Sequence, residues 1–296
     1  MTVVEAFRKL TGKLIALYDK REAENITDMV IEKITGLRRM ERILKKEIEL
    51  TVQQEKELEH YLSELLQHKP VQYVLQEAWF YGLPFFVNEH VLIPRPETEE
   101  LVEWIITGVK SHSHPPFTIL DIGTGSGCIP VALKKQLDAS VVTAIDVSGQ
   151  ALGVAKKNAD NNNVSIDFLL VDALNETQLN TLPVFDIIVS NPPYIPLTDM
   201  ADMQENVLNY EPHTALFVPD EDPLLFYKAI AKFASSHLNN AGKVYVEIHE
   251  AQGEAAKKIF EKNGFTNCMI KKDMQGKDRM LRAGIGSSEQ EMVADE

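Results

Sequence analysis

Four consecutive residues, Asn191-Pro192-Pro193-Tyr194, combine groups that could hold an NH2 group for a reaction. They follow an apolar run at residues 185–189, which has the composition of a buried strand. Proline has a fixed φ and no N–H, so the pair holds its carbonyls rigidly where the strand ends. An NH2 group there would give one hydrogen to the Asn191 oxygen and the other to the Pro192 carbonyl, with the Tyr194 ring against its planar face. The motif therefore suits a planar, weakly nucleophilic nitrogen.

An Asn-Pro pair by itself is typical of a turn after a strand, so the chemical interpretation depends on a second feature upstream. After Asp121 and Ile122 the chain reads Gly123-Thr124-Gly125-Ser126-Gly127, followed by a helical stretch. Glycines at alternate positions let the backbone turn tightly under a bulky ligand and present NH groups at a helix start. The spacing is neither Gly-x-Gly-x-x-Gly nor that of a phosphate loop. The segment indicates a nucleotide-shaped ligand, and close packing is the alternative reason for its glycines.

Acidic residues end the next two apolar runs. Asp146 lies about twenty residues beyond the glycines, where an acidic side chain accepts both hydroxyls of a ribose. The alternative is that Asp146 caps a helix expected at residues 150–158. Asp172 and Ala173 follow the third run, where a side chain or the backbone could meet an adenine edge.

Short apolar runs that alternate with helical stretches must position these residues. Such alternation predicts an α/β fold with a doubly wound, mostly parallel sheet. Ligands in that architecture bind at the carboxyl ends of the strands, where all the motifs above fall. The runs lie at residues 118–122, 141–145, 166–171, 185–189 and 244–248.

Composition and residue spacing differ in two other parts of the chain. Residues 2–68 lack proline and carry apolar residues three and four apart, as in a helical bundle. Aromatic residues interrupted by Gly82 and Pro84 indicate a β-hairpin. We therefore expect a helical domain at residues 1–70, a β-hairpin linker at 71–93, a catalytic domain at 94–282 and a disordered acidic tail at 283–296.

Composition excludes several classes of protein. The 296 residues carry a formal net charge of -14, which argues against broad contact with nucleic acid. Neither a signal sequence nor a membrane span is evident, so we expect a cytoplasmic protein. We also expect it to be a monomer. Cys128 and Cys268 predict no disulfide, and His112 and His114 fit a polar loop better than a metal site. No metal is expected.

The motifs together resemble a known family. The glycine-rich segment, Asp146 and the Asn191 to Tyr194 motif, in this order, resemble the S-adenosylmethionine-dependent amino methyltransferases. Other segments narrow the resemblance, over nearly the whole chain, to the HemK/PrmC-type release factor glutamine methyltransferases. They are Pro70-Val71-Gln72-Tyr73, Ile93-Pro94-Arg95-Pro96-Glu97-Thr98-Glu99, Glu211-Pro212 and Ala215-Leu216.

This resemblance implies a substrate and a set of site residues. The substrate would be the glutamine of the Gly-Gly-Gln loop in class I peptide chain release factors, methylated on its side-chain nitrogen and docked with help from the helical domain. S-adenosylmethionine would be converted to S-adenosylhomocysteine. The resemblance implies a Rossmann-like class I methyltransferase domain. Cofactor contacts would come from Gly123, Thr124, Gly125, Ser126, Gly127, Asp146, Asp172, Ala173 and Asn191; catalysis from Asn191, Pro192 and Tyr194; and substrate contacts from these three with Pro193 and Arg95.

The chain departs from the family pattern at three places. Residues 217–223 stand where the family usually has glycines after the Ala-Leu pair. His249 and Gln76 each stand at a position where a glycine is usual. The tetrad at residues 191–194 is intact.

Other functions stay open at this point. An adenine-N6 DNA methyltransferase would use the same two acceptors on an exocyclic amine, but it requires base flipping and a basic surface. The sequence distinguishes poorly between a methyltransferase that acts on the glutamine of a release factor and one that acts on the glutamine of a ribosomal protein. A non-catalytic nucleotide-binding module would be expected to lose Asn191, Asp146 or the glycines, and the glycine spacing disfavours a nicotinamide dehydrogenase.

Overall fold

The computed structural model describes residues 1–110 and 116–285, which divide into two units. The smaller unit contains Met1–Glu77 and Met203–Glu211, and the larger contains the remaining described residues. Each unit has its own hydrophobic core, as the change in sequence texture predicts.

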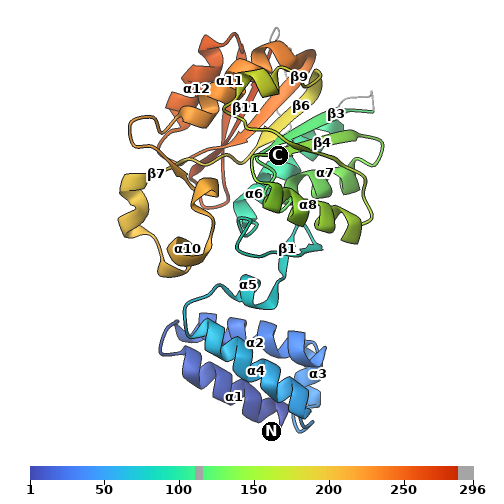
Figure 1. The fold of residues 1–296 in the computed structure, drawn as a ribbon, viewed down its shortest axis with the longest axis vertical. Coiled ribbons are helices and arrows are strands. Elements are labelled where there is room, and N and C mark those ends of the chain that lie inside the picture. The colour runs from blue at the N-terminus through green and yellow to red at the C-terminus, as the bar shows by residue number, and fades with distance from the viewer. Residues whose placement is uncertain (111–115, 286–296) are drawn as a thin grey trace, which may run out of the picture. The chain divides into compact units, whose positions relative to one another are not determined.

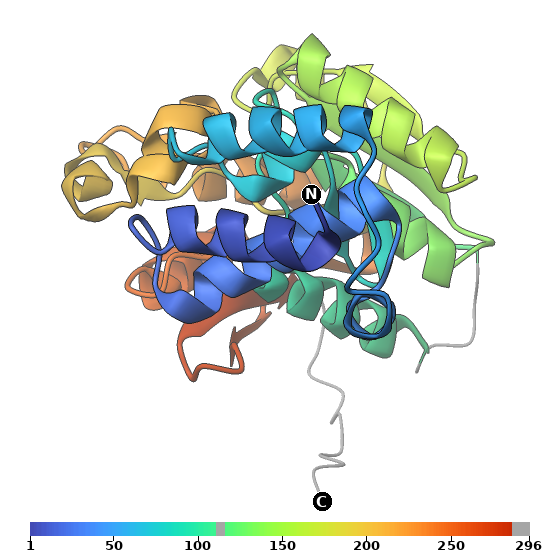
Figure 2. The same cartoon turned by 90° about the horizontal axis from the view of Figure 1, so that it is seen from below.

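The smaller unit is a helical bundle. Three of its helices begin at an N-cap residue whose side chain accepts a hydrogen bond from a backbone N–H of the first turn. These residues are Thr2, Asp19 and Thr51. Helices α1, α2 and α4 contact one another and lie side by side in Figures 1 and 2. Their apolar faces bury a core that includes Leu10 and Leu58. The helices are α1 (Val3–Leu14), α2 (Lys20–Thr35), α3 (Arg39–Leu44), α4 (Val52–Leu65), α5 (Val71–Leu75) and α10 (Glu205–Tyr210).

The expected linker at residues 71–93 is wrong in its first part, because α5 belongs to the smaller unit. Helix α5 buries Val71, Val74 and Leu75 in the bundle core. It ends at Gln76, whose φ of 53° is left-handed. That conformation favours glycine, which is the residue the family pattern has there.

The larger unit alternates strands and helices. It begins with the hairpin of β1 (Ala78–Phe80) and β2 (Leu83–Phe85), followed by α6 (Pro96–Lys110). The remaining elements are β3 (Thr118–Ile122), α7 (Cys128–Gln136), β4 (Val141–Asp146), α8 (Gly149–Asn161), β5 (Asp167–Leu170), α9 (Glu176–Leu179), β6 (Phe185–Ser190), β7 (Ile195–Pro196), η1 (Leu197–Asp202), η2 (His213–Ala215), β8 (Phe217–Val218), α11 (Leu225–His237), β9 (Leu238–Glu247), α12 (Gly253–Lys262), β10 (Asn267–Lys272) and β11 (Asp278–Gly284).

Seven strands form the central sheet in the order β10-β11-β9-β6-β3-β4-β5. Strands β5, β4, β3, β6 and β9 pair in parallel, whereas β11 is antiparallel to both of its neighbours. The expected mostly parallel, doubly wound sheet is confirmed (Figure 1). Because β3 pairs with β4 on one side and β6 on the other, the strand order reverses there, which opens a crevice at the carboxyl ends.

Alternate residues of the central strands enter two separate cores. Ile119 and Ile187 pack with α6 and α7 on one face, and Leu120 and Ile188 pack with α11 and α12 on the other. A period of two in a strand buried on both faces produces this division. The sheet is therefore covered by helices on both faces.

The carboxyl-terminal part differs from expectation. The strand expected at residues 244–248 is the end of the longer β9, and the hairpin of β10 and β11 was not predicted. The tail expected from residue 283 starts too early, because Ala283 and Gly284 pair with Val244 and Lys243. Residues 286–296 lie outside the described part.

Two further findings concern the described residues. None of their helices has the length and apolar character needed to span a bilayer. They contain no cluster of three or more His, Cys, Asp or Glu side chains arranged to hold a metal ion. His112 and His114 lie outside the described residues.

Candidate active site

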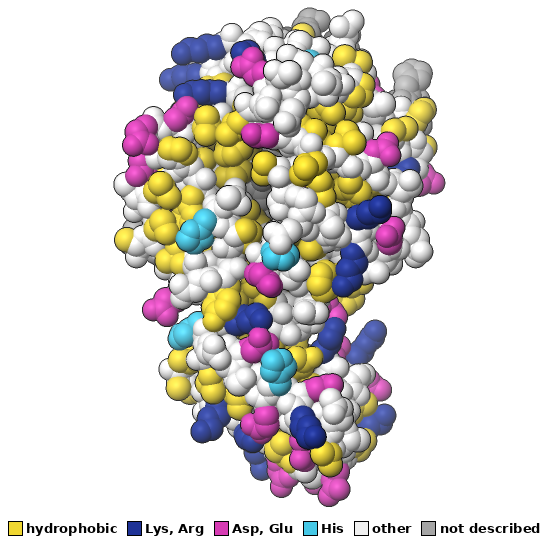
Figure 3. All heavy atoms as spheres, viewed as in Figure 1, with side chains coloured by type: hydrophobic (Ala, Val, Ile, Leu, Met, Phe, Trp, Pro, Cys, Tyr) yellow, Lys and Arg dark blue, Asp and Glu magenta, His cyan; other side chains and the backbone are white. Residues whose placement is uncertain are grey.

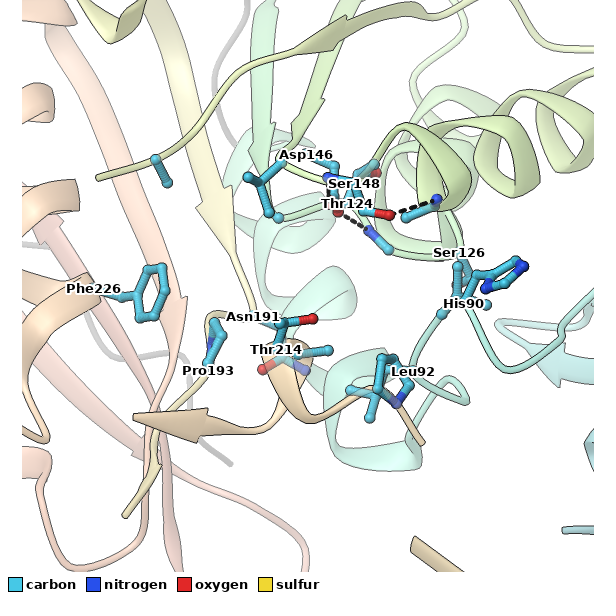
Figure 4. A pocket seen from close by; sticks show the side chains of 18 of the residues that line it. His90, Leu92, Thr124, Ser126, Asp146, Ser148, Asn191, Pro193, Thr214 and Phe226 are labelled. Atoms are coloured by element: carbon cyan, nitrogen blue, oxygen red, sulfur yellow. Dashed lines mark hydrogen bonds between the residues drawn. The ribbon is translucent and has the colours of Figure 1, made fainter. Parts of the chain in front are cut away.

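A cavity of about 580 Å³ lies in the larger unit at the carboxyl ends of the parallel strands. Its walls come from the loops that follow β3, β4, β5 and β6, from residues 89–98 and from residues 212–226. On this face of the larger unit, hydrophobic side chains border a hollow (Figure 3). Figure 4 shows Thr124, Asp146 and Ser148 on one side of the cavity, with Asn191, Pro193 and Thr214 across from them. Of the expected site residues, all line the cavity except Gly127, Pro192 and Tyr194.

The loop after β3 is held by its own backbone. Gly123 N and Thr124 N both donate to the Ile145 carbonyl, at 2.9 and 3.0 Å, and Gly127 N donates to the Thr124 carbonyl at 2.8 Å. Gly125 N donates to Asp146 Oδ2 at 2.8 Å. The expectation that NH groups along this loop serve the ligand is therefore wrong for these four. Gly123 and Gly125 instead leave their part of the cavity wall without side chains.

Gly127 has a packing role. Its φ is 78°, and a Cβ there would lie 3.0 Å from the Ala155 Cβ and 3.1 Å from the Ala155 Cα. It stands immediately before α7, and Ala155 is buried on α8. The alternative interpretation of the glycines, close packing, thus applies to Gly127, which lets α7 approach α8.

Asp146 joins the loops after β3 and β4. Its Oδ2 accepts from Gly125 N, and its Oδ1 accepts from Ser148 N at 2.9 Å. The N-cap of α8 is Ser148, whose hydroxyl accepts from Ala151 N, so the helix-cap interpretation of Asp146 is wrong. Burial raises the pKa of Asp146, and these backbone hydrogen bonds oppose that shift. Asp146 presents a carboxylate at the cavity wall, and Asp172 and its neighbour Ala173 also line the cavity.

A second carboxylate lies just before the loop. Asp121 is fully buried on β3, and within the described residues neither its oxygens nor the Thr124 hydroxyl has a hydrogen-bond partner. Burial raises the pKa of Asp121 to about 7; the neighbouring Thr124 hydroxyl lowers it, and the nearby Asp146 charge raises it. Buried polar groups are nearly always paired in folded proteins. Of the two residues, only Thr124 lines the cavity, so its unpaired hydroxyl, next to the buried Asp121, indicates a place for a polar ligand group.

The Asn191 motif follows β6 as expected. Asn191 and Pro193 line the cavity, and Figure 4 shows their side chains close together. The Asn191 Nδ2 donates to Thr98 Oγ1 at 3.1 Å. The side chain of Pro192 is buried and does not reach the cavity wall.

The contacts of Tyr194 differ from the aromatic contact expected from the sequence. Its hydroxyl donates to Glu247 Oε1 at 3.0 Å, and its ring packs against the core under α11 and edge-on against His249. Tyr194 is not among the residues that line the cavity. Phe217 and Phe226 supply the aromatic wall instead, and Phe226 lies beside Pro193 in Figure 4.

The sequence interpretation missed several of these residues. Thr98 belongs to a family segment and Glu247 to the apolar run at residues 244–248, and neither was expected at the site. For Glu247, the available signal was a carboxylate at the end of the fifth parallel strand. Nothing local marks Phe217 or Phe226 as cavity residues. Arg95 lines the cavity together with Leu92 on the segment before α6.

Comparisons with known proteins agree with this geometry. Residues 108–209 match the Methyltransferase small domain family, and residues 5–75 match the PrmC N-terminal domain. The chain is 46% identical over 273 residues to a release factor glutamine methyltransferase of Flavobacterium psychrophilum, which covers 92% of this chain and 95% of the relative. It is 40% identical to the one of Streptococcus pneumoniae, over 95% of this chain and 98% of that protein.

A solved structure supports the fold alone. The catalytic domain of hMettl16, in complex with the MAT2A 3'UTR hairpin 6, aligns with a TM-score of 0.56 at 17% identity. The alignment covers 80% of this chain and 83% of that one.

The sheet order, the cavity at its switch point and the matched domain make this chain a methyltransferase with a Rossmann-like fold. The identity and coverage of the relatives then place it more narrowly. The chain belongs to the release factor glutamine methyltransferase family.

Proposed function

We propose that this protein transfers a methyl group from S-adenosylmethionine to the side-chain nitrogen of the glutamine in the Gly-Gly-Gln loop of class I peptide chain release factors. The observation that carries the proposal is the Asn191 amide at the cavity wall. Its NH2 group is engaged by Thr98, which leaves the Oδ1 acceptor for a ligand. An acceptor in that position suits an NH2 group on the substrate.

The residues present fit the cofactor. Asp146 supplies the acceptor for ribose hydroxyls, and Asp172 with Ala173 supplies an edge for adenine. The unpaired Thr124 hydroxyl at the cavity wall, with the buried Asp121 next to it, would supply an acceptor that suits the cofactor's ammonium group. When bound, S-adenosylmethionine provides an electrophilic methyl group on a sulfonium. A cavity of about 580 Å³ falls in the range of cofactor sites.

The protein's own contribution is orientation. A glutamine amide is a poor nucleophile because its lone pair is delocalised into the carbonyl, so placement and fixed dipoles must supply the catalysis. The Asn191 Oδ1 and the Pro192 carbonyl would accept the two amide hydrogens and aim the nitrogen. Pro193 stiffens the turn, and Arg95 lines the substrate mouth. The methylated nitrogen, once positively charged, is acidic enough to lose a proton to water without a strong base.

We also propose that the smaller unit docks the release factor. Its residues 5–75 match a domain named for this family, and it has a separate core that does not contribute to the cavity. On this proposal the protein acts as a monomer without direct contact to nucleic acid.

A methyl-transfer assay tests the function. The purified protein would be incubated with labelled S-adenosylmethionine and, separately, a class I release factor, the same factor with the loop glutamine changed to alanine, ribosomal proteins and DNA. We expect label only in the unmodified release factor, on the glutamine side chain by mass spectrometry. Label in the ribosomal or DNA arm alone would replace this proposal with the corresponding alternative.

A further inference from the structure

Three chain segments meet at the carboxylate of Glu247. Glu247 ends β9 and is only 2% exposed, as is Thr98 in the first turn of α6. Glu247 Oε2 accepts from the Thr98 hydroxyl at 2.6 Å, and Oε1 accepts from the Tyr194 hydroxyl at 3.0 Å. Thr98 in turn accepts from the Asn191 Nδ2 at 3.1 Å. A continuous chain of hydrogen bonds therefore runs from the cavity residue Asn191 to a buried carboxylate.

The direction of these bonds follows from proton counting. A threonine hydroxyl has one proton to donate, and here it goes to Glu247. Thr98 can therefore only accept from Asn191, and an acceptor selects the NH2 end of an amide. The two ends of the Asn191 amide have the same shape, so sterics alone would not distinguish them. The carboxylate decides which end faces Thr98.

We infer that Glu247 is a positioning residue that, through Thr98, holds the Asn191 amide with its oxygen available to the substrate and, through the Tyr194 hydroxyl, holds the far end of the same motif. The inference deepens the proposed function and rests on it for the identity of the acceptor. An ionised carboxylate suits this role because it only accepts hydrogen bonds. A glutamine in its place would offer an NH2 group to one of the two hydroxyls and allow the chain to run in reverse.

The hydrogen-bond partners of Glu247 favour its ionised form and act against its burial. Burial is the largest effect and holds the pKa of Glu247 above its ordinary value, and the Glu97 charge acts in the same direction. The hydrogen bonds from Thr98 and Tyr194 and the positive charge of Arg279 oppose that shift. Arg279 also pairs with Asp273 and Glu250 on the β10 and β11 side, so the positive charge is held in place. One oxygen of Glu247 thus holds Thr98, which holds Asn191, and the other holds Tyr194 at the opposite end of the same four-residue motif.

The test compares Glu247→Gln, Thr98→Val and Thr98→Ser in the full chain. Positioning by this network predicts a fall in kcat of about 10- to 100-fold for Glu247→Gln and Thr98→Val. It predicts recovery of most of kcat in Thr98→Ser, which keeps the hydroxyl. The KM for the acceptor and the calorimetric affinity for S-adenosylmethionine should change less than about threefold, since neither residue is assigned to hold the cofactor.

A matched control comes from the other end of the sheet. Asp186 is a half-buried acid that, like Glu247, accepts from a threonine hydroxyl and a second side chain: from Thr118 at 2.7 Å and from Asn239 Nδ2 at 2.7 Å. Asp186 is not among the described cavity residues. Asp186→Asn should lower thermal stability while kcat stays near the wild-type value. Equal losses of kcat in Asp186→Asn and Glu247→Gln would assign both acids to stability and overturn the inference.

A second readout does not depend on the acceptor. In NMR spectra, the Asn191 side-chain NH2 signal, identified by its loss in Asn191→Ala, should exchange slowly with solvent in the wild type and in Thr98→Ser. It should exchange faster in Glu247→Gln and Thr98→Val. Unchanged exchange together with unchanged kcat in Glu247→Gln would overturn the inference. A failure of the release-factor assay with slow exchange retained would reject the proposed substrate alone.

Discussion

The Ser190 hydroxyl donates to the carbonyl of Ile122 at 2.7 Å, and this bond joins the ends of two neighbouring parallel strands. Ser190 is the last residue of β6 and Ile122 is the last of β3, so the bond places Asn191 directly beside the glycine-rich loop. Two motifs 68 residues apart thus share one cavity wall. The cofactor and acceptor portions of the site are adjacent because the strands that carry them are adjacent.

Asn191→Ala should abolish methyl transfer without unfolding the protein. The change removes one of the two proposed acceptors for the substrate amide, and losing one preorganised hydrogen-bonding group costs about 100- to 1,000-fold in kcat. The assay is labelled methyl incorporation into a release factor, with circular dichroism to confirm the fold. Asn191→Asp is the matched variant, because it keeps an oxygen but loses the NH2 that Thr98 accepts. Near-normal turnover of Asn191→Ala would reject the proposed mechanism.

Asp146→Ala should weaken cofactor binding more than it lowers kcat at saturation. The variant loses the proposed ribose acceptor and also the bonds to Gly125 N and Ser148 N that shape the wall. We expect the dissociation constant for S-adenosylmethionine to rise about 10- to 100-fold, as for the loss of a charged hydrogen-bond acceptor. Isothermal titration calorimetry measures it directly. An unchanged affinity would remove the ribose assignment.

Asp121 should make the ligand-free protein less stable as the pH rises. Its folded pKa of about 7 lies above the value near 3.9 expected when unfolded, so the folded state binds more protons between these two values. The free energy of unfolding therefore falls, by on the order of 4 kcal/mol in total, as the pH rises from about 4 to about 7. Asp121 causes no further change above that range. Asp121→Asn removes this dependence. Urea unfolding of both proteins at pH 5 and pH 8 checks it, and parallel pH profiles would contradict it.

Gly127→Ala should destabilise the larger unit. The added methyl would meet Ala155 at 3.0 Å in a backbone conformation with φ of 78°, so strain and overpacking combine. We expect the free energy of unfolding to fall by about 2 to 4 kcal/mol. Gly12→Ala is the control, since Gly12 is in α1 with open space around it. The free energy of unfolding of this variant should rise by about 0.5 to 1 kcal/mol. Thermal melting measures both, and equal stability of the Gly127 variant and the wild type would contradict the packing role.

Local patterns in the chain were sufficient for the class of fold and for the part of the cavity wall that comes from the loops after β3, β4, β5 and β6. Alternating apolar runs and helical stretches predict a parallel sheet, and parallel strands bring their carboxyl ends to one edge. The glycine loop, Asp146 and Asn191 each follow such a run directly, so their meeting follows from strand order alone. The helical nature of the first 70 residues was equally evident, because the spacing of apolar residues is a local property.

Tertiary structure alone decided what each side chain contacts. Gly127 and Gly125 look alike in the sequence, yet one packs against Ala155 while the other lines the cavity. Tyr194 was expected at the substrate and instead bonds to Glu247, a residue 53 positions away. Thr98 and Asn191, 93 positions apart, meet only after the helix α6 and the strand β6 have packed. Such contacts depend on how separate elements dock, and the spacing of residues along one element carries no information about that.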